Sequence, residues 1–372
     1  MNMTSPKPTG EYAVGTFTYS IMNQREEVLK PGTMRSISAR VYYPTEKTAI
    51  SGFPKSRHMS RSVTEGIRRA MYIPLNYDKM EASGTNVSEC YEGAPHIEGK
   101  KFPLIMFHHG SGSYVEGNSF LLIELASQGY VVISVSHPME SAGADFNDGS
   151  SVIYEKFVTK QMYKPFIPAV IALAKLMKLK GTDEERAAKF DEVQRKYCKF
   201  LMGRLDEWVK DNDAAVDYAR EHFTDFIDFS KGIGIAGHSM GGNTAYRLCT
   251  TNPDYVCGIN IDGAFFGDYT GATLDVPFLQ VSCKDNENVV SRVYLNHSAP
   301  VYKALFKDMR HAGFSDMKHA MKPGLTVGKL DPDKMHENMC HAFLEIFDTY
   351  LKKVKPEPEL KSNDTVTYTK FQ

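Results

Sequence analysis

The chain has 372 residues, of which 42% are hydrophobic and 24% charged, with 44 basic residues against 45 acidic ones. This apolar content is enough to bury a core, so the composition excludes a chain that is disordered throughout. A formal net charge of −1 gives no reason to expect nucleic acid or a strongly charged substrate as a partner.

The N-terminal residues lack the apolar segment that a signal peptide needs, and no apolar run approaches the roughly 18 residues of a membrane span. The 6 cysteines are scattered without CxxC spacing, which favours reduced thiols over a disulfide framework. We therefore expect a cytoplasmic protein, or a secreted one if a leader has been removed. No partner protein is evident from the sequence.

The N-terminal part of the chain predicts a mixture of strands and helix. In chain order the expected elements are a strand at 11–20, a strand at 36–44, a surface excursion with a short helix at 46–101, a strand at 102–107, a helix at 117–128 and a strand at 130–136. The runs FPLIMF and YVVISVS are almost entirely apolar, apart from the two serines of the second run. Such runs joined by a helix are typical of buried parallel strands.

The rest of the chain continues the alternation of strands and helices. In chain order we expect a helical segment at 151–222, a strand at 231–237, a helix at 240–251, strands at 256–261, 277–283 and 301–309, and a helix at 336–353. This order predicts an α/β protein with a mostly parallel central sheet and helices on both faces. We expect a single domain over 1–372, with 151–222 as a lid-like helical insertion above the sheet and 356–372 as a loosely ordered tail.

One serine of the chain is surrounded by glycines, in the sequence Gly237-His238-Ser239-Met240-Gly241. G-x-S-x-G is the pattern of a sharp strand-to-helix turn that exposes a serine hydroxyl at the edge of an α/β-hydrolase sheet. A serine hydroxyl is a weak nucleophile, so it needs a general base and a third group that orients the base. In this fold an acid and then a histidine follow the serine along the chain.

Two aspartates compete for the role of the acid. Asp262 directly follows the predicted strand 256–261, and Asp285 follows the next one. Both lie at carboxyl ends of strands, where α/β sheets place functional groups, so the pattern alone does not separate them. His311 directly follows the last predicted strand and is the candidate base.

The chain also supplies candidates for the two N–H groups that an ester oxyanion needs. One is the N–H of Met240, directly after the serine, and the other is that of Ser111, in the His109-Gly110-Ser111-Gly112 loop after the strand 102–107. A metal site is not expected. His336 and His341 would lie about 140° apart on a helix, which does not suit two ligands of one ion.

Taken in order, the blocks FPLIMFHHGSGS, LASQGYVVISVSHP, GIAGHSMGG, CGINIDGAFF and RHAGFSD resemble the plasma and intracellular type II platelet-activating factor acetylhydrolase family of α/β hydrolases. The resemblance implies a serine esterase with Ser239, Asp262 and His311 as its triad, and it favours Asp262 over Asp285. It further implies hydrolysis of short-acyl esters through an acyl-enzyme, with no cofactor or metal. The expected substrate is a small ester or a short-acyl phospholipid-like molecule, as for a 1-alkyl-2-acetylglycerophosphocholine esterase in lipid degradation.

Other functions fit parts of the same pattern. A dienelactone-hydrolase-like or polyester-type esterase would use Asp285 as its acid, and an acyltransferase would change only the acceptor. A binding protein that has kept the fold without the chemistry is the alternative outside enzymes. The run PFIPAVIALAKLMKLK predicts a buried amphipathic helix on base rates, with a lid or an interfacial helix for weak membrane-surface association as the alternative.

Overall fold

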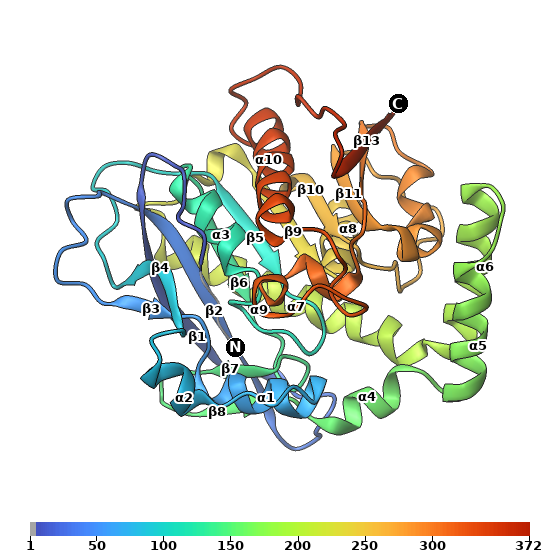
Figure 1. The fold of residues 1–372 in the computed structure, drawn as a ribbon, viewed down its shortest axis with the longest axis horizontal. Helices are drawn as coiled ribbons and strands as arrows, with labels where there is room; N and C mark the ends of the chain where they lie inside the picture. Colours follow the sequence, from blue (N-terminus) through green and yellow to red (C-terminus); the bar gives the residue numbers. More distant parts are fainter. Residues whose placement is uncertain (1–4) are drawn as a thin grey trace. The chain divides into compact units, whose positions relative to one another are not determined.

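The computed structural model describes residues 5–372, and Figure 1 shows its ribbon. The chain forms two compact units. Unit 1 comprises Met1–Glu155, Lys210–Gly234 and Ser315–Lys322, and unit 2 comprises Lys156–Val209, Ile235–Phe314 and Pro323–Gln372. Two boundaries between the units fall inside the segment 151–222, and the single domain over 1–372 stays a prediction.

The sheet of unit 1 has the strand order β5-β6-β2-β1-β4-β3. These strands are β1 (Ala13–Glu26), β2 (Met34–Thr45), β3 (Lys55–Arg57), β4 (Val87–Glu92), β5 (Leu104–His108) and β6 (Val131–Val135). β1 and β2 form a long antiparallel pair, with Phe17 opposite Val41, whereas β5 and β6 are parallel, with Met106 opposite Ile133. Every side chain of β5 and β6 is buried, which explains their apolar sequences.

Short elements complete unit 1. They are α1 (Arg61–Met71), α2 (Tyr77–Ala82), α3 (Ser119–Ser127), β7 (Gly143–Asp145), β8 (Ser151–Ile153), α9 (Met317–Ala320) and the C-terminal part of α7 (Lys199–His222). Ser60 caps α1 by accepting a hydrogen bond from the Val63 N–H. The excursion at 46–101 is thus more regular than the sequence predicts, because it supplies two helices and also the strands β3 and β4, which extend the sheet.

The sheet of unit 2 has the strand order β9-β10-β11-β12-β13. Its strands are β9 (Ile233–His238), β10 (Tyr255–Ile261), β11 (Phe278–Cys283), β12 (Val301–Phe306) and β13 (Val366–Phe371), and its longer helices outside 151–222 are α8 (Met240–Thr251) and α10 (Pro332–Tyr350). β10, β11 and β12 run parallel, with Ile259 opposite Leu279 and Leu279 opposite Tyr302. Their carboxyl ends therefore lie at one edge, which is where the polar loops of the site begin.

The C-terminal tail is not loosely ordered as the sequence predicts. Its last residues form β13, which pairs antiparallel with β12, with Val366 opposite Phe306 and Phe371 opposite Val301. The segment VTYTKF is rich in β-branched and aromatic residues, and it covers the edge that β12 would otherwise expose. The polar residues before it obscured this signal in the sequence.

The helices α4 (Lys156–Met162), α5 (Phe166–Met177) and α6 (Asp183–Tyr197) and the start of α7 confirm the helical character of 151–222. The expectation that the run at 165–180 is buried is wrong. Phe166, Ile167, Val170 and Ile171 are 63%, 70%, 44% and 50% exposed, because α5 packs on its neighbours mainly through Ala169 and Leu176. Within residues 5–372, no helix combines the length and the apolar character that crossing a bilayer requires.

Replacing Val366 by alanine should test how far β13 contributes to stability. The Val366 side chain is fully buried, so Val366→Ala should lower the free energy of unfolding by about 1–3 kcal/mol, seen as a lower urea midpoint. Thr369→Ala is the matched control, since Thr369 lies on the same strand with its side chain exposed. Equal midpoints for the two variants would contradict a packed tail.

Candidate functional site

The serine of the G-x-S-x-G sequence lies in a sharp turn between β9 and α8. Ser239 has φ 56° and ψ −118°, a strained conformation for a residue with a side chain. A Cβ at Gly237 would lie 2.2 Å from the carbonyl carbon of Gly241, and one at Gly242 would lie 1.8 Å from Asn260 Oδ1. The glycines are therefore needed because the turn brings backbone and side chains too close for any other residue.

The structure brings the three predicted triad residues together within unit 2. Ser239 Oγ lies 2.9 Å from His311 Nε2, and His311 Nδ1 lies 2.8 Å from Asp262 Oδ2. A carboxylate only accepts hydrogen bonds, so Nδ1 carries the proton and Nε2 accepts from the serine hydroxyl. The arrangement is that of a nucleophile, a base and a group that orients the base.

The carboxylate of Asp262 is fully buried and is held by several donors. Its Oδ1 accepts the Cys283 N–H at 2.9 Å, and its Oδ2 accepts the Asn286 amide at 2.6 Å and faces the Cys283 thiol at 3.3 Å. Burial, together with the nearby Asp262 charge, raises the pKa of the Cys283 thiol, so the sulfur remains protonated and donates. Both carboxylate oxygens of Asp262 are therefore hydrogen-bonded in spite of its burial.

The competing aspartate lies elsewhere. Asp285 forms an ion pair with Arg310, and both side chains are well exposed, at 37% and 43%. Asn286, the next residue, instead turns inward and lies 3.2 Å from His311 Nδ1 as well as against Asp262. The sequence does not predict that Asn286 and Cys283 hold the triad aspartate, because no spacing pattern marks the residues that hydrogen-bond to a triad acid.

His311 begins a short turn of 3₁₀ helix after β12, and His238 supports it. The two imidazole rings lie 4.8 Å apart, and the Nε2 of His238 lies 3.1 Å from the carbonyl oxygen of His311. The residue before the nucleophile is thus in contact with the base. The side chain of His311 is 43% exposed, so a substrate can reach it from solvent.

The two predicted oxyanion donors lie in different units. Met240 is the first residue of α8, where an N–H has no acceptor within the helix. Ser111 belongs to unit 1, and its N–H makes no hydrogen bond among the described residues. That these two N–H groups face one oxyanion stays a prediction.

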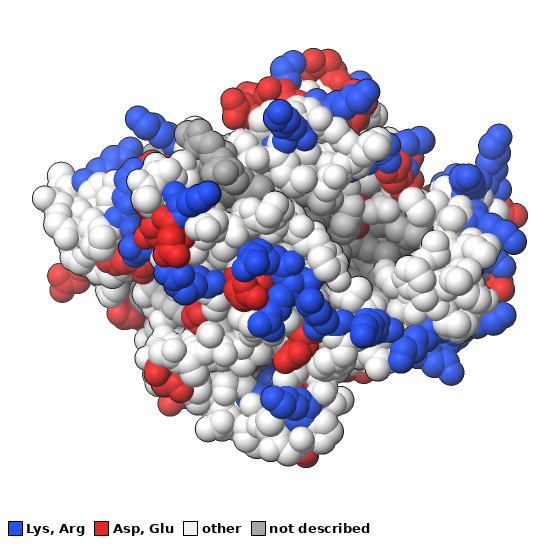
Figure 2. Space-filling view, turned by 60° about the horizontal axis from the view of Figure 1, so that its bottom comes forward, with Lys and Arg blue, Asp and Glu red and all other residues white. Residues whose placement is uncertain are grey.

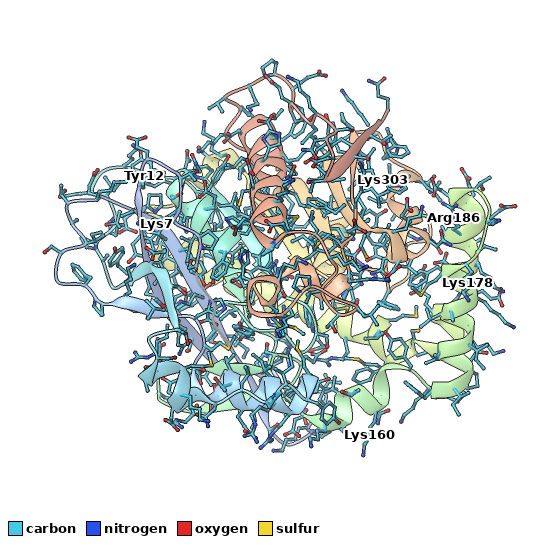
Figure 3. The ribbon with its side chains drawn as sticks, in the orientation of Figure 1. Lys7, Tyr12, Lys160, Lys178, Arg186 and Lys303 are labelled. Carbon is cyan, nitrogen blue, oxygen red and sulfur yellow. The ribbon has the colours of Figure 1, made fainter. Side chains whose placement is uncertain are left out.

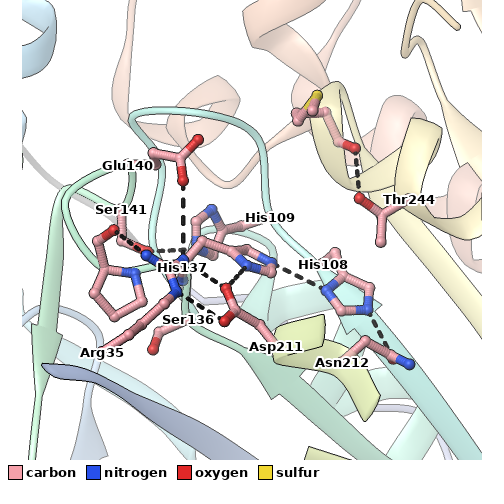
Figure 4. Close-up of polar contacts among 12 residues, drawn as sticks. Arg35, His108, His109, Ser136, His137, Glu140, Ser141, Asp211, Asn212 and Thr244 are labelled. Carbon is pink, nitrogen blue, oxygen red and sulfur yellow. Dashed lines mark hydrogen bonds and ion pairs between the residues drawn. The ribbon is translucent and has the colours of Figure 1, made fainter. Parts of the chain in front are cut away.

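Unit 1 also contains a buried polar cluster, in which the ring of His137 lies against that of His109 (Figure 4). Its centre is Asp211, which binds Arg35 through both carboxylate oxygens, at 2.8 and 2.6 Å, and His137 Nδ1 at 2.8 Å. Although burial alone would raise the pKa of Asp211, the Arg35 guanidinium holds it well below its usual range. Burial lowers the pKa of His108 and of His109 to about 4, so both rings are neutral at pH 7.

No group of three or more His, Cys, Asp or Glu side chains within residues 5–372 is arranged to hold a metal ion. His336 lies against Cys340, with 3.5 Å between Nε2 and Sγ, whereas His341 lies 3.2 Å from the carbonyl oxygen of Glu359. All 6 cysteines are buried free thiols. The absence of a cofactor stays a prediction.

The alternating strands and helices, with a serine on the turn after β9 and an acid and a histidine after β10 and β12, define a protein of the α/β-hydrolase fold. A ferulic acid esterase from Streptomyces cinnamoneus has a similar structure, with a TM-score of 0.69 over 97% of each chain at 19% sequence identity. That likeness concerns the fold alone. The predicted fold class is confirmed.

The chain belongs to the family described as platelet-activating factor acetylhydrolase, isoform II, whose family model matches residues 1–268. It is 26% identical over 275 residues to platelet-activating factor acetylhydrolase of Gallus gallus, covering 68% of this chain and 63% of that protein. It is also 26% identical over 272 residues to that of Canis lupus familiaris, covering 69% of this chain and 54% of that protein. The chain thus spans less than two thirds of these relatives, and the resemblance inferred from the sequence is confirmed.

Proposed function

We propose that this protein is a carboxylic ester hydrolase that works through an acyl-enzyme on Ser239. The observation that carries the proposal is the unbroken hydrogen-bonded series from Ser239 Oγ through His311 to the buried carboxylate of Asp262. Membership of the acetylhydrolase family and the names of the curated relatives support an ester as substrate.

In the proposed reaction Ser239 Oγ attacks the carbonyl carbon of the ester while its proton moves to His311 Nε2. The carbonyl oxygen becomes an oxyanion, which the N–H groups of Met240 and Ser111 stabilise. The carbon–oxygen bond to the alcohol then breaks, and His311 gives its proton to the departing alkoxide. His311 next takes a proton from a water molecule, which attacks the acyl carbon of the acyl-enzyme. His311 then gives that proton to Ser239 Oγ as the carboxylic acid leaves.

Asp262 acts on His311 rather than on the substrate. It keeps the proton of the neutral ring on Nδ1 and stabilises the imidazolium that forms after the attack. Asn286 and Cys283 fix the Asp262 carboxylate by hydrogen bonds, so the carboxylate does not have to reorient during the reaction.

The proposed substrate is a small ester or a short-acyl phospholipid-like molecule, by analogy with the relatives that are named platelet-activating factor acetylhydrolase. The protein would then act as a 1-alkyl-2-acetylglycerophosphocholine esterase does, in lipid degradation. An ester panel of graded acyl length, run beside long-chain phosphatidylcholine, would test this class. A cytoplasmic location stays a prediction.

Ser239→Ala should remove nearly all hydrolysis of p-nitrophenyl acetate, by a factor on the order of 10⁶, because the members of a triad act as a unit. A fluorophosphonate probe should label the unsubstituted protein at Ser239 and leave the variant unlabelled. Ser83→Ala, at an exposed residue after α2, is the control. Wild-type protein that neither hydrolyses esters nor labels would favour the binding-protein alternative.

The two aspartates give a second, independent test. Asp262→Asn should lower kcat by about 10⁴, because the amide favours the wrong tautomer of His311. Asp285→Asn should change kcat by no more than about threefold, because the exposed pair with Arg310 contributes little. The reverse ranking would support the polyester-type alternative, in which Asp285 is the acid.

We also propose that α5 gives the protein a weak affinity for an anionic membrane surface. Its exposed Phe166, Ile167, Val170 and Ile171 side chains form one apolar face. Exposed lysines flank this face along the chain, at Lys160, Lys164, Lys175, Lys178 and Lys180. Figure 2 shows surface without charged side chains bordered by basic side chains in this region, and Figure 3 labels Lys160 and Lys178, which precede and follow α5 in the chain. An apolar face bordered by lysines is typical of helices that lie in a lipid interface.

The double variant Ile167→Glu/Ile171→Glu should bind vesicles of phosphatidylcholine and phosphatidylserine at least about tenfold more weakly, since each isoleucine removed from water contributes roughly 1.5–3 kcal/mol. Binding is measured by cosedimentation, and hydrolysis of soluble p-nitrophenyl acetate should stay unchanged. Val354→Glu, at an apolar side chain that is 68% exposed outside α5, is the control. Vesicle binding that is equal in all three proteins would contradict the proposal.

A further inference from the structure

The peptide group between Gly110 and Ser111 is held by two hydrogen bonds to its carbonyl oxygen. The carbonyl oxygen of Gly110 accepts His109 Nδ1–H at 2.7 Å and the Ser113 N–H at 2.9 Å. In a trans peptide the C=O and the following N–H point in opposite directions. Two donors on the Gly110 oxygen therefore orient the Ser111 N–H away from them, and that N–H has no hydrogen-bond acceptor among the described residues.

The hydrogen bonds that join His109 to Ser141 and to Gly110 have only one consistent direction. The His137 N–H can only donate, so Ser141 Oγ accepts it, at 2.8 Å. The Ser141 hydroxyl proton is then free to donate to His109 Nε2, which lies 2.8 Å away. His109 Nδ1 must in turn donate to the Gly110 carbonyl, because a carbonyl oxygen only accepts. The neutral ring that this arrangement requires agrees with burial, which lowers the pKa of His109 to about 4.

The turn that supplies Ser141 is itself held by further hydrogen bonds. Its first residue, His137, is bonded to Asp211, which the buried guanidinium of Arg35 holds through both oxygens. The turn also binds the Ser111 loop through its backbone, by Gly112 N–H to Glu140 O and Ala142 N–H to Ser113 O, both at 2.6 Å. Figure 4 shows Ser141, His109 and His137 converging in this cluster.

We propose that His109 and Ser141 are positioning residues, which hold the Gly110–Ser111 peptide in the orientation that presents the Ser111 N–H to the ester oxyanion. The inference rests on the proposed function, in which Ser111 is an oxyanion donor. Glycine before Ser111 leaves this peptide free to rotate. A rotated peptide would present the Gly110 carbonyl oxygen instead, which would repel the oxyanion, so the orientation needs the hydrogen bond from His109.

Two substitutions of His109 separate this role from packing. His109→Leu fills the site but removes the donor to Gly110, so kcat for p-nitrophenyl acetate should fall about 10²–10³-fold, as for loss of one oxyanion donor, with KM within about threefold. In His109→Asn the side-chain amide can replace Nδ1–H, and kcat should stay within about tenfold of the unsubstituted protein. His222→Leu, at an exposed histidine, is the control.

A transition-state analogue provides the second readout. An aryl trifluoromethyl ketone forms an oxyanion on Ser239, so its inhibition constant should rise in His109→Leu by the same factor by which kcat/KM falls. Equal losses in the leucine and asparagine variants, or kcat within threefold of the parent in His109→Leu, would overturn the proposal.

Ser141→Ala replaces His109→Leu as the test if the leucine variant does not fold, which a thermal unfolding measurement would reveal. The Ser141→Ala substitution removes the hydroxyl that sets the tautomer of His109, so it should lower kcat about tenfold or more with KM little changed. Unchanged kcat in Ser141→Ala would likewise overturn the proposal. Failure of the proposed function would look different, because the unsubstituted protein would then neither hydrolyse the ester nor react with the fluorophosphonate probe.

Discussion

The candidate site depends on one hydrogen bond, between the buried carboxylate of Asp262 and Nδ1 of His311. Because Nδ1 donates to this carboxylate, Nε2 is the nitrogen that faces the hydroxyl of Ser239. The bond joins the loop after β10 to the loop after β12, so it requires the parallel register of β10, β11 and β12. A shift of one residue in either pairing would turn the side chains at the strand ends to the opposite face. The core of unit 2 therefore sets the geometry of the chemistry.

Two strained residues lie beside each other at this edge. Ser239 and Asp262 both have φ 56°, a conformation that costs about 1–3 kcal/mol for each residue with a side chain. The sheet holds both of them, because the Ser239 N–H donates to Ile261 O at 2.9 Å and the Asp262 N–H donates to Val281 O at 2.8 Å. Backbone hydrogen bonding thus continues past the ends of β9 and β10, and it helps to orient the side chains of Ser239 and Asp262.

The sequence predicts most of the strands and the order of the triad, because apolar runs and a G-x-S-x-G turn are local signals. It does not separate Asp262 from Asp285, since both follow strand ends, and only the packing shows that Asp285 turns outward to Arg310. The strand β13 was missed because a polar linker precedes it. The exposed face of α5 was missed for another reason: periodicity predicts an apolar face without saying what covers it.

Two buried polar side chains, those of Asn260 and His109, have a shared explanation. Asn260 lies in the buried strand β10, yet its side chain binds both the N–H and the carbonyl of Gly263, each at 2.8 Å, and also Gln280 Oε1 at 2.9 Å. Gly263 is required there, because a Cβ would lie 2.0 Å from the carbonyl oxygen of Ser239. Glycine permits this close approach but leaves the peptide free to turn, and the buried amide of Asn260 removes that freedom. His109 has the same relation to Gly110, so at both loops a buried, fully bonded side chain orients a peptide that glycine alone would leave mobile.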